Sequence, residues 1–343
     1  MTRRILIANA ALAAVLTVGT ASAQQVLINA GGATFPYPIY SKWFDEYHKK
    51  LPNIAINYAS IGSGGGIAQV TAGTVDFGAS DGPMTDAQIK EFQDKRGYAI
   101  LHFPTVMGAD VPTYNIPGVT ASLNFTGEAL AGIFMGKITK WDDPEITKAN
   151  AGVKLPSSNI VVVHRSDNSG TTYIWTDYLS KASKEWEMKV GRGTGVNWPV
   201  GLGGKGNEGV SGSVQQTANS IGYVEIAYAI QNKMTFGKVK NAAGEFIQAS
   251  LASVTAAAAG MKDMPEDFRV SITNAPGKGV YPISSFTWLL IPSKIADPAK
   301  KKAIKDFLAW MLADGQKMTE PLLYAPLPKA VVTKELKAID KIQ

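Results

Sequence analysis

Three stretches of this chain share one pattern, in which a loop rich in glycine and hydroxyl residues leads into an apolar segment with helical spacing. The loops are residues 31–36, 62–66 and 165–171, and strand-like segments at 54–58 and 160–163 precede the second and third. At a helix start, unpaired backbone N–H groups and the positive end of the helix dipole converge, so each loop is a candidate anion site. Strands that alternate with helices predict an α/β fold.

The third loop contains the most side chains that could bind an anion. It reads Arg-Ser-Asp-Asn-Ser-Gly-Thr and is followed by an apolar helix expected from residue 172. Arg165 offers a planar fork of donors suited to phosphate or carboxylate, and Ser169 and Thr171 can each donate one more hydrogen bond. The alternative is an ordinary capped helix beside a surface arginine, and this loop alone does not decide between the two.

The other two loops add hydroxyls, and a carboxylate follows them. Thr34 lies in the first loop and Ser63 in the second, where a glycine turn is expected before a short helix at 67–72. A buried strand predicted at 75–81 then ends in Asp81, at the edge where open α/β sheets bind ligands. The alternative is that Asp81 caps a helix before Pro83, because Asp is a preferred cap residue.

A carboxylate in an anion site repels the anion unless the anion brings a proton for it to accept. Phosphate at neutral pH carries such a proton, whereas sulfate does not. Asp81 would therefore discriminate against sulfate by setting one acceptor against another.

Several stretches of the chain resemble the motifs of one protein family. They are residues 32–36, 62–63, 75–81 and the pattern Arg-x-Asp-x-Ser-Gly-Thr at 165–171, with further similarity at 198–207 and 222–225. On these residues the chain resembles the periplasmic phosphate-binding proteins of the high-affinity phosphate ABC importer. The resemblance implies a two-lobed periplasmic binding protein of type II, in which each lobe is a mixed sheet flanked by helices and the ligand lies in the cleft between them.

The resemblance also implies a set of ligand contacts. The residues implied to contact phosphate are Thr34, Phe35, Ser63, Asp81, Arg165, Ser169, Gly170 and Thr171. Asp167 would orient Arg165. The chain departs from the family pattern at 106–114, where Asp110 and Pro112 interrupt a segment expected to be uniformly apolar, and this departure concerns the hinge and not the ligand.

The length of the chain predicts two domains, because about 320 residues exceed what one hydrophobic core usually organises. Stretches rich in glycine and proline at 104–118 and 274–282 are the candidate crossovers. We therefore expect a discontinuous first domain at 24–108 and 282–343, and a second domain at 109–281, with the ligand between them.

The N-terminus predicts export. Arg3 and Arg4 precede an apolar run at 5–18, and Ala-Ser-Ala at 21–23 supplies small residues for cleavage after Ala23, which is the layout of a secretory signal peptide at 1–23. The apolar run is shorter than the ~20 residues that span a bilayer, which favours cleavage over a membrane anchor. The chain has no cysteine for a disulfide or for lipid attachment, so we expect a protein free in the periplasm.

The charge balance argues against a nucleic-acid partner. Without the two arginines of the signal peptide, 32 basic residues stand against 28 acidic ones, for a net charge of +4. No dense stripe of lysine and arginine interleaves with aromatic residues. The family resemblance implies inorganic phosphate and an inner-membrane ABC phosphate permease as partners, and we expect a monomeric protein.

Two alternatives remain open at this point. A secreted phosphomonoesterase is one, since phosphate sites are common in hydrolases, but a triad of His164, Asp167 and Ser169 is disfavoured because the three crowd into one strand-to-loop turn. A receptor for another tetrahedral oxyanion such as sulfate is the other, and Asp81 argues against it. With three histidines and no cysteine, we expect neither a metal nor a cofactor.

Overall fold

The computed structural model describes residues 25–343 except residue 262, so the predicted signal peptide at 1–23 lies outside the described residues. Its main feature is a nine-stranded mixed sheet in the order β2-β1-β3-β12-β4-β8-β6-β7, with β9 paired to β4. The strands are β1 (Val26–Gly32), β2 (Ile54–Ser60), β3 (Phe77–Ser80), β4 (Ile100–Asn115), β6 (Val161–Arg165), β7 (Leu202–Gly204), β8 (Ser220–Glu225), β9 (Thr235–Phe236) and β12 (Ser284–Pro292).

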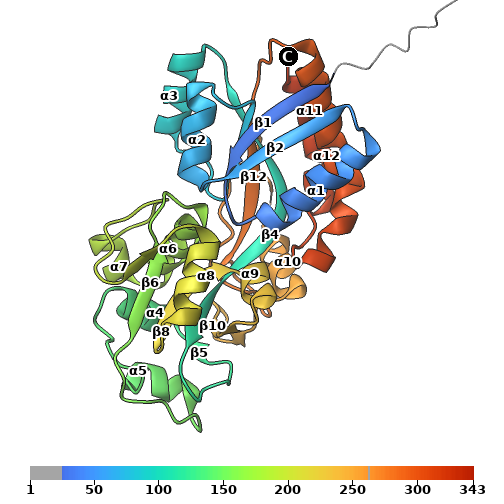
Figure 1. Ribbon diagram of the computed structural model, residues 1–343. Coiled ribbons are helices and arrows are strands. Elements are labelled where there is room, and N and C mark those ends of the chain that lie inside the picture. Colours follow the sequence, from blue (N-terminus) through green and yellow to red (C-terminus); the bar gives the residue numbers. More distant parts are fainter. Residues whose placement is uncertain (1–24, 262) are drawn as a thin grey trace, which may run out of the picture.

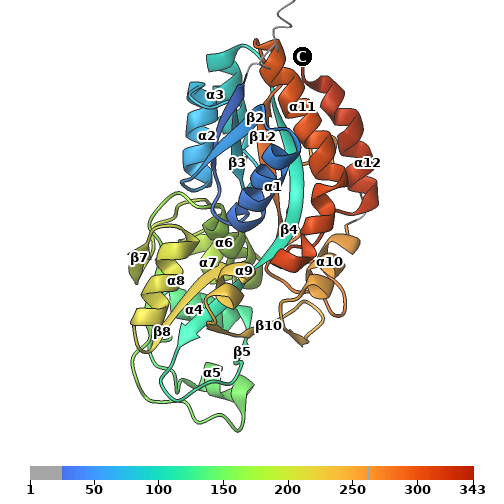
Figure 2. The same cartoon turned by 45° about the vertical axis from the view of Figure 1, so that its right-hand side comes forward.

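Strand β4 belongs to both ends of this sheet. Its residues 100–109 pair antiparallel with β12, and its residues 110–115 pair antiparallel with β8. We call the part built on β1, β2, β3 and β12 the first lobe and the part built on β6, β7 and β8 the second lobe. Figures 1 and 2 show the two lobes joined along β4.

In the first lobe, helices cover both faces of the sheet (Figure 1). On one face lie α1 (Tyr37–Lys50), α11 (Pro298–Ala313) and α12 (Lys329–Ala338), and on the other lie α2 (Ser63–Ala72) and α3 (Asp86–Arg96). Aromatic residues join α1 to α11, with the rings of Phe44 and Phe307 5.5 Å apart. The short helices η2 (Gly315–Met318), η3 (Glu320–Leu322) and η4 (Ile339–Lys341) complete this lobe.

In the second lobe, neighbouring residues of β8 face helices on opposite sides. Tyr223 stacks on Trp175 of α6 (Gly170–Ala182) with 4.9 Å between ring centroids, whereas Gly222 lies against Val210 and Val214 of α8 (Gly206–Gln216). This alternation follows from the two-residue period of a strand. The remaining elements are α4 (Gly127–Phe134), α5 (Pro144–Thr147), η1 (Lys148–Asn150), α7 (Lys184–Lys189), α9 (Ile226–Gln231), α10 (Leu251–Ala259) and a small sheet of β5 (Asn124–Phe125), β10 (Lys238–Lys240) and β11 (Phe246–Ile247).

Two prolines lie inside β4, where a proline removes a hydrogen bond of the ladder. Pro104 lies next to a β-bulge at Thr105, because Trp288 pairs with Pro104 while Thr287 pairs with Val106, and a bulge is a place where a central strand tolerates proline. The predicted crossover at 104–118 is thus a strand as far as residue 115. The predicted domain boundary at 108/109 lies one residue before the point, between Ala109 and Asp110, where β4 changes partners. The division of the chain into those two domains stays a prediction.

The expectation of a glycine loop at 62–66 before a helix at 67–72 is wrong beyond Gly62, because α2 already begins at Ser63. A side chain at Gly66 would collide with the backbone of Gly32 and Ala79, and one at Gly64 would collide with Asn168 of the other lobe. These glycines therefore permit close packing inside a helix, and that packing outweighs their poor helix propensity.

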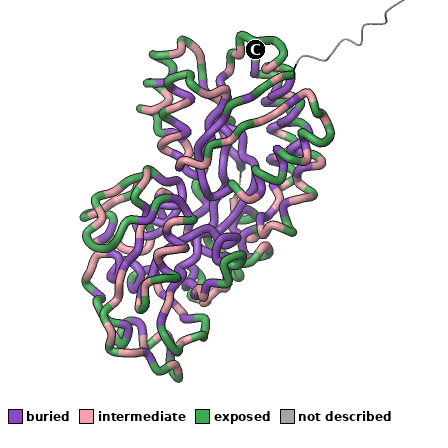
Figure 3. Tube along the Cα trace, viewed as in Figure 1, coloured by how far each residue is buried: buried purple, intermediate pink, exposed green. Residues whose placement is uncertain are grey.

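Buried residues run along the sheet and through the seam between the lobes (Figure 3). The helices within the described residues are all too short or too polar to cross a membrane.

One buried acid in the first lobe gives a testable stability prediction. Glu335 of α12 is fully buried, and neither of its carboxyl oxygens has a hydrogen-bond partner among the described residues. Burial raises the pKa of Glu335 well above its ordinary value, so the folded state favours the protonated form. The stability that depends on a protonated Glu335 is fully present below the unfolded-state pKa of this group. It is lost as the pH rises through the folded-state pKa.

We expect Glu335→Gln to stabilise the protein at pH 8 by about 1–3 kcal/mol, because the amide cannot ionise, and to change stability much less at pH 5. Thermal unfolding followed by circular dichroism at both pH values measures this. The exposed Glu320→Gln is the matched control. An equal effect of Glu335→Gln at both pH values would contradict the prediction.

Candidate functional site

The residues predicted to bind an anion come from loops of both lobes and meet in the seam between them. Thr34 and Phe35 lie between β1 and α1, Ser63 begins α2, and Asp81 follows β3. Arg165 ends β6, and residues 169–171 form the start of α6. All eight predicted residues are buried: Thr34, Phe35, Ser63, Asp81, Arg165, Ser169, Gly170 and Thr171.

The two lobes touch at these loops. The backbone N–H of Gly64 donates to the carbonyl oxygen of Asn168 at 2.9 Å, and a side chain at Gly170 would overlap the Ser63 hydroxyl and the Asp81 carboxyl. Glycine is thus required at residue 170 for the start of α6 to approach the first lobe. The structure brings the three loops together in a closed arrangement.

Arg165 is held by a carboxylate two residues further on. Its Nε donates to Asp167 Oδ1 at 2.8 Å, and its Nη2 donates to Asp167 Oδ2 at 2.5 Å. The backbone N–H of Gly206 also donates to Asp167 Oδ1, at 3.1 Å. This two-point contact fixes the plane of the guanidinium, which is only 2% exposed.

The charges of this pair stabilise each other. Burial lowers the pKa of Arg165, but the hydrogen bonds and the charge of Asp167 outweigh burial and raise it. Burial raises the pKa of Asp167, but the hydrogen bond and the charge of Arg165 bring it below its ordinary value. Both groups are therefore ionised at neutral pH. Of the five N–H groups of Arg165, two go to Asp167 and one to Thr171 at 3.1 Å, which leaves two without a partner in the described chain.

Asp81 accepts hydrogen bonds from both of its neighbours in the first lobe. Thr287 Oγ1 of β12 donates to Asp81 Oδ1 at 2.8 Å, and Ser63 Oγ lies 3.4 Å from Asp81 Oδ2. The alternative interpretation of Asp81 as a helix cap is wrong, because the next helix, α3, begins at Asp86 and is capped by Thr85. Local cap preference could not reveal that the chain runs on for four residues before this helix.

Burial raises the pKa of Asp81 to about 7, and the hydrogen bond from Thr287 and the positive charge of Arg165 partly oppose that rise. Asp81 therefore exchanges its proton in the physiological pH range. A carboxyl group of this kind can accept the proton of a ligand or supply one to it.

The start of α6 combines a cap with free donors. Ser169 Oγ accepts a hydrogen bond from the backbone N–H of Thr172 at 3.1 Å, so the helix is capped as the alternative interpretation supposed. Arg165, however, is not on the surface. The backbone N–H groups of Gly170 and Thr171 have no partner among the described residues, as is typical of a first helical turn.

The geometry gives little support to a catalytic triad or to a metal site. His164 Nδ1 lies 2.9 Å from the carbonyl oxygen of Arg165, and Asp167 is committed to Arg165, so the three residues of the imagined triad do not connect. Within the described residues, no group of three or more histidine, cysteine or acidic side chains is placed to hold a metal ion. The site consists of a cation, hydroxyls, free N–H groups and one acceptor, which suits a small oxyanion that carries a proton.

Sequence reasoning missed several polar residues that contact the site residues, among them Thr287, Tyr228 and Asn207. Thr287 contacts Asp81, Tyr228 donates to the carbonyl oxygen of Thr34 at 2.6 Å, and Asn207 donates to the hydroxyls of Thr34 and Thr171. Asn207 lies just after β7 and inside the start of α8, so it follows a fourth junction of strand, glycine loop and helix. That repeated pattern is the signal that could have found it.

The departure at Asp110 places a second acid near Asp81. Asp110 pairs in register with Glu225 across β4 and β8, both residues are fully buried, and neither oxygen of the Asp110 carboxyl has a hydrogen-bond partner among the described residues. Burial, followed by the negative charges of Asp81 and Glu225, raises the pKa of Asp110 well above its ordinary value. A neutral Asp110 adds no charge to the seam.

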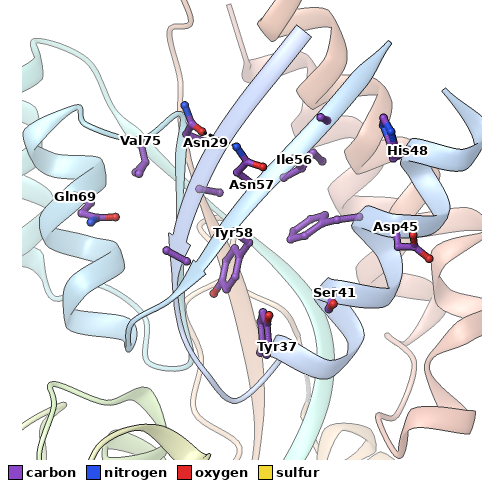
Figure 4. A pocket seen from close by; sticks show the side chains of 14 residues that line it. Asn29, Tyr37, Ser41, Asp45, His48, Ile56, Asn57, Tyr58, Gln69 and Val75 are labelled. Atoms are coloured by element: carbon purple, nitrogen blue, oxygen red, sulfur yellow. Dashed lines mark hydrogen bonds between the residues drawn. The ribbon is translucent and has the colours of Figure 1, made fainter. Parts of the chain in front are cut away.

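An open surface cavity lies elsewhere. It has a volume of about 670 Å³ and borders the free edge of β2, between α1 and α2 (Figure 4). Polar side chains such as Asn29, Asn57 and Tyr58 line it, and none of the eight predicted site residues does. The candidate site is thus a closed seam and not this cavity.

Known proteins with similar sequences are named phosphate-binding proteins. A family model described as a PBP superfamily domain matches residues 18–315. Phosphate-binding protein PstS of Xylella fastidiosa (strain Temecula1) is 47% identical over 317 residues, which is 92% of this chain and 85% of that relative. Phosphate-binding protein PstS of Pasteurella multocida is 44% identical over 97% of this chain and 94% of that relative.

Solved structures agree in fold. A phosphate-binding protein from Stenotrophomonas maltophilia has a TM-score of 0.69 at 18% identity, over 91% of this chain and 93% of that chain. A putative phosphate ABC transporter substrate-binding protein from Clostridium perfringens has a TM-score of 0.64 at 17% identity, over 88% of this chain and 100% of that chain. These matches confirm the predicted α/β binding-protein fold.

The environment of Asp81 predicts its titration in the ligand-free protein. We expect the carboxyl-carbon NMR signal of Asp81 to titrate with a midpoint of about pH 7, and Thr287→Val to move that midpoint upward, because the lost hydrogen bond stabilises the ionised form. Asp81→Asn identifies the signal by removing it. A midpoint near the ordinary aspartate value of 3.8 would contradict the buried environment described here.

Proposed function

The chain belongs to the PBP superfamily and, within it, to the PstS phosphate-binding proteins, and on that premise we propose that it captures inorganic phosphate and delivers it to an ABC-type phosphate import permease. The observation that carries the proposal is the presence of one buried guanidinium and one buried carboxyl, Arg165 and Asp81, in the same seam. A cation attracts the anion, and an acceptor of suitable pKa receives its proton.

We assign the eight buried seam residues as the phosphate contacts. Arg165 supplies charge through its two unpartnered N–H groups, and the hydroxyls of Thr34, Ser169 and Thr171 supply neutral donors. The hydroxyl of Ser63 adds another when its proton turns from Asp81 to the ligand. The free backbone N–H groups at the start of α6 add donors along the positive end of that helix. Asp167 keeps the guanidinium in place and does not itself contact the ligand.

Selectivity comes from Asp81 in this proposal. The ionised carboxylate accepts the proton of bound phosphate, whereas sulfate at the same pH offers lone pairs only and leaves two acceptors face to face. Thr287 supports this role, because its hydroxyl donates to one carboxyl oxygen and leaves the other turned toward Ser63 and Gly170.

We further propose that the protein works in the periplasm as a monomer, after removal of residues 1–23, and that residues 24–108 with 282–343 and residues 109–281 form its two domains. The N-terminal sequence pattern supports export, and a structurally similar protein is described as a periplasmic phosphate-binding protein. The proposal treats the protein as a receptor without turnover, since the imagined triad of His164, Asp167 and Ser169 is not connected.

Replacing Arg165 tests the proposed site. We expect calorimetric titration to show phosphate binding by the parent and a loss of roughly 2 to 5 kcal/mol of binding free energy in Arg165→Ala, because a desolvated anion then lacks its charge-assisted donors. Lys181→Ala, which removes a cation outside the seam, is the control. Affinity of Arg165→Ala within about threefold of the parent would show that Arg165 is not a ligand.

An activity assay on the same purified protein distinguishes a receptor from a hydrolase. Incubation with a phosphomonoester should release no phosphate, and steady release by the parent but not by Arg165→Ala would favour the phosphomonoesterase instead.

Replacing Asp81 tests the proposed selectivity. We expect Asp81→Asn to admit sulfate, because an amide donor replaces the repelling lone pair, while phosphate keeps its other contacts. In the parent, sulfate competition against labelled phosphate should strengthen as the pH falls through about 7, where Asp81 becomes protonated, and Asp81→Asn should lose that dependence. If the variant rejects sulfate as strongly as the parent across this range, the discrimination lies elsewhere.

A further inference from the structure

We propose that Asn207 is a positioning residue that fixes the hydroxyls of Thr34 and Thr171 as donors toward the bound anion. This inference rests on the proposed phosphate-binding function. Asn207 lies in the first turn of α8 in the second lobe and is fully buried, so no water can take over its hydrogen bonds.

The side-chain amide of Asn207 has one orientation that satisfies its surroundings. Its Oδ1 accepts a hydrogen bond from the backbone N–H of Glu225 at 2.9 Å, and a backbone N–H can only donate. The opposite end, Nδ2, must therefore be the donor that faces the two threonines. The backbone N–H of Glu225 therefore fixes which end of the Asn207 amide donates to the threonines. The rotation of the threonine hydroxyls has no part in that choice.

Both acceptor positions of the Thr34 hydroxyl are occupied from Asn207. Its Oγ1 accepts from Asn207 Nδ2 at 2.8 Å and from the backbone N–H of Asn207 at 3.3 Å. A hydroxyl oxygen has two lone pairs and one proton, so Thr34 has only its proton left to offer. The hydroxyl therefore presents a donor and not a lone pair to the seam.

The Thr171 hydroxyl is in the same situation. Its Oγ1 accepts from Arg165 Nη1 at 3.1 Å and from Asn207 Nδ2 at 3.1 Å. Its proton too is free to point at an anion. The two N–H bonds of Asn207 Nδ2 are thereby used, one for each threonine, so Asn207 acts on the anion through these hydroxyls and does not contact it.

This arrangement also joins the lobes. Thr34 belongs to the first lobe and Thr171 to the second, and one amide group holds both. An anion that binds between the hydroxyls meets two donors whose rotation is already restricted, so less ordering cost is incurred on binding.

Reversing the polarity of this amide is the direct test. Asn207→Asp keeps the shape of the side chain but turns the donor toward the threonines into an acceptor, so both hydroxyls must donate to it and show lone pairs to the anion. We expect phosphate affinity in calorimetric titration at pH 8 to fall by about 30-fold or more. Asn207→Ala, which frees the hydroxyls without reversing them, should lose less, about 5-fold to 10-fold.

A second buried asparagine provides the matched control. Asn150 Nδ2 donates to the carbonyl oxygens of Asn124 and Ile146, and its Oδ1 accepts from the backbone N–H of Asn124. Like Asn207 it donates twice and accepts once, but away from the seam and to carbonyl oxygens in place of hydroxyls. Asn150→Asp should destabilise the protein as measured by thermal unfolding, yet keep phosphate affinity within about twofold of the parent.

A double-mutant cycle separates positioning from general damage. Thr34→Val should weaken phosphate binding about 10-fold in the parent but by less than about twofold in Asn207→Asp, because the Thr34 hydroxyl there donates to the new carboxylate and not to the anion. Independent effects in the cycle, or affinity of Asn207→Asp within about threefold of the parent, would overturn the role of Asn207 alone. A parent that does not bind phosphate would overturn the proposed function first and this inference with it.

Discussion

Arg165 is only 2% exposed, and the ion pair with Asp167 offsets the cost of burying its charge in the seam. Asp167 neutralises the charge and uses only part of the donor set, which leaves a cation with open N–H groups in a dry environment. Electrostatic interactions are strong in such an environment because water does not screen them. The approach of Gly206 to the same carboxylate ties the start of α8, and with it Asn207, to this ion pair.

The polar groups around this ion pair fall into two sets, one of hydrogen-bond donors and one with a hydrogen-bond acceptor. On one side, Arg165, Asn207 and the first turn of α6 donate, and the hydroxyls between them are left with protons to give. On the other side, Asp81 is the acceptor, held by Thr287 and adjusted by burial to a pKa of about 7. A ligand that matches both sets needs several lone pairs and one proton, which is a more specific requirement than negative charge alone.

The sequence was sufficient for the fold class and for the loops of the site, because strand, glycine loop and helix leave local signals that repeat. It was not sufficient where a residue acts through distant packing. Residues 64–66 look like a turn and are helical, because their small size serves close packing: Gly64 approaches Asn168, about a hundred residues away, and Gly66 approaches the backbone of Gly32 and Ala79. Thr287 likewise carries no local sign of contact with Asp81, because strand order brings it there. Asn207 follows a loop of the same pattern as the other three, but only the packing of the two lobes brings it to Thr34. The phosphate contacts themselves remain predictions for the experiments above to decide.

The continuity of β4 limits how the lobes can move apart. A flexible loop lets two bodies rotate about a point, whereas a strand that keeps β12 as its partner on one stretch and β8 on the next can only flex and twist over many residues. Bending of such a connection is spread over small changes in the φ and ψ angles of many residues. Any separation of the lobes must also break the contacts across the seam, such as the hydrogen bond from Gly64 to Asn168.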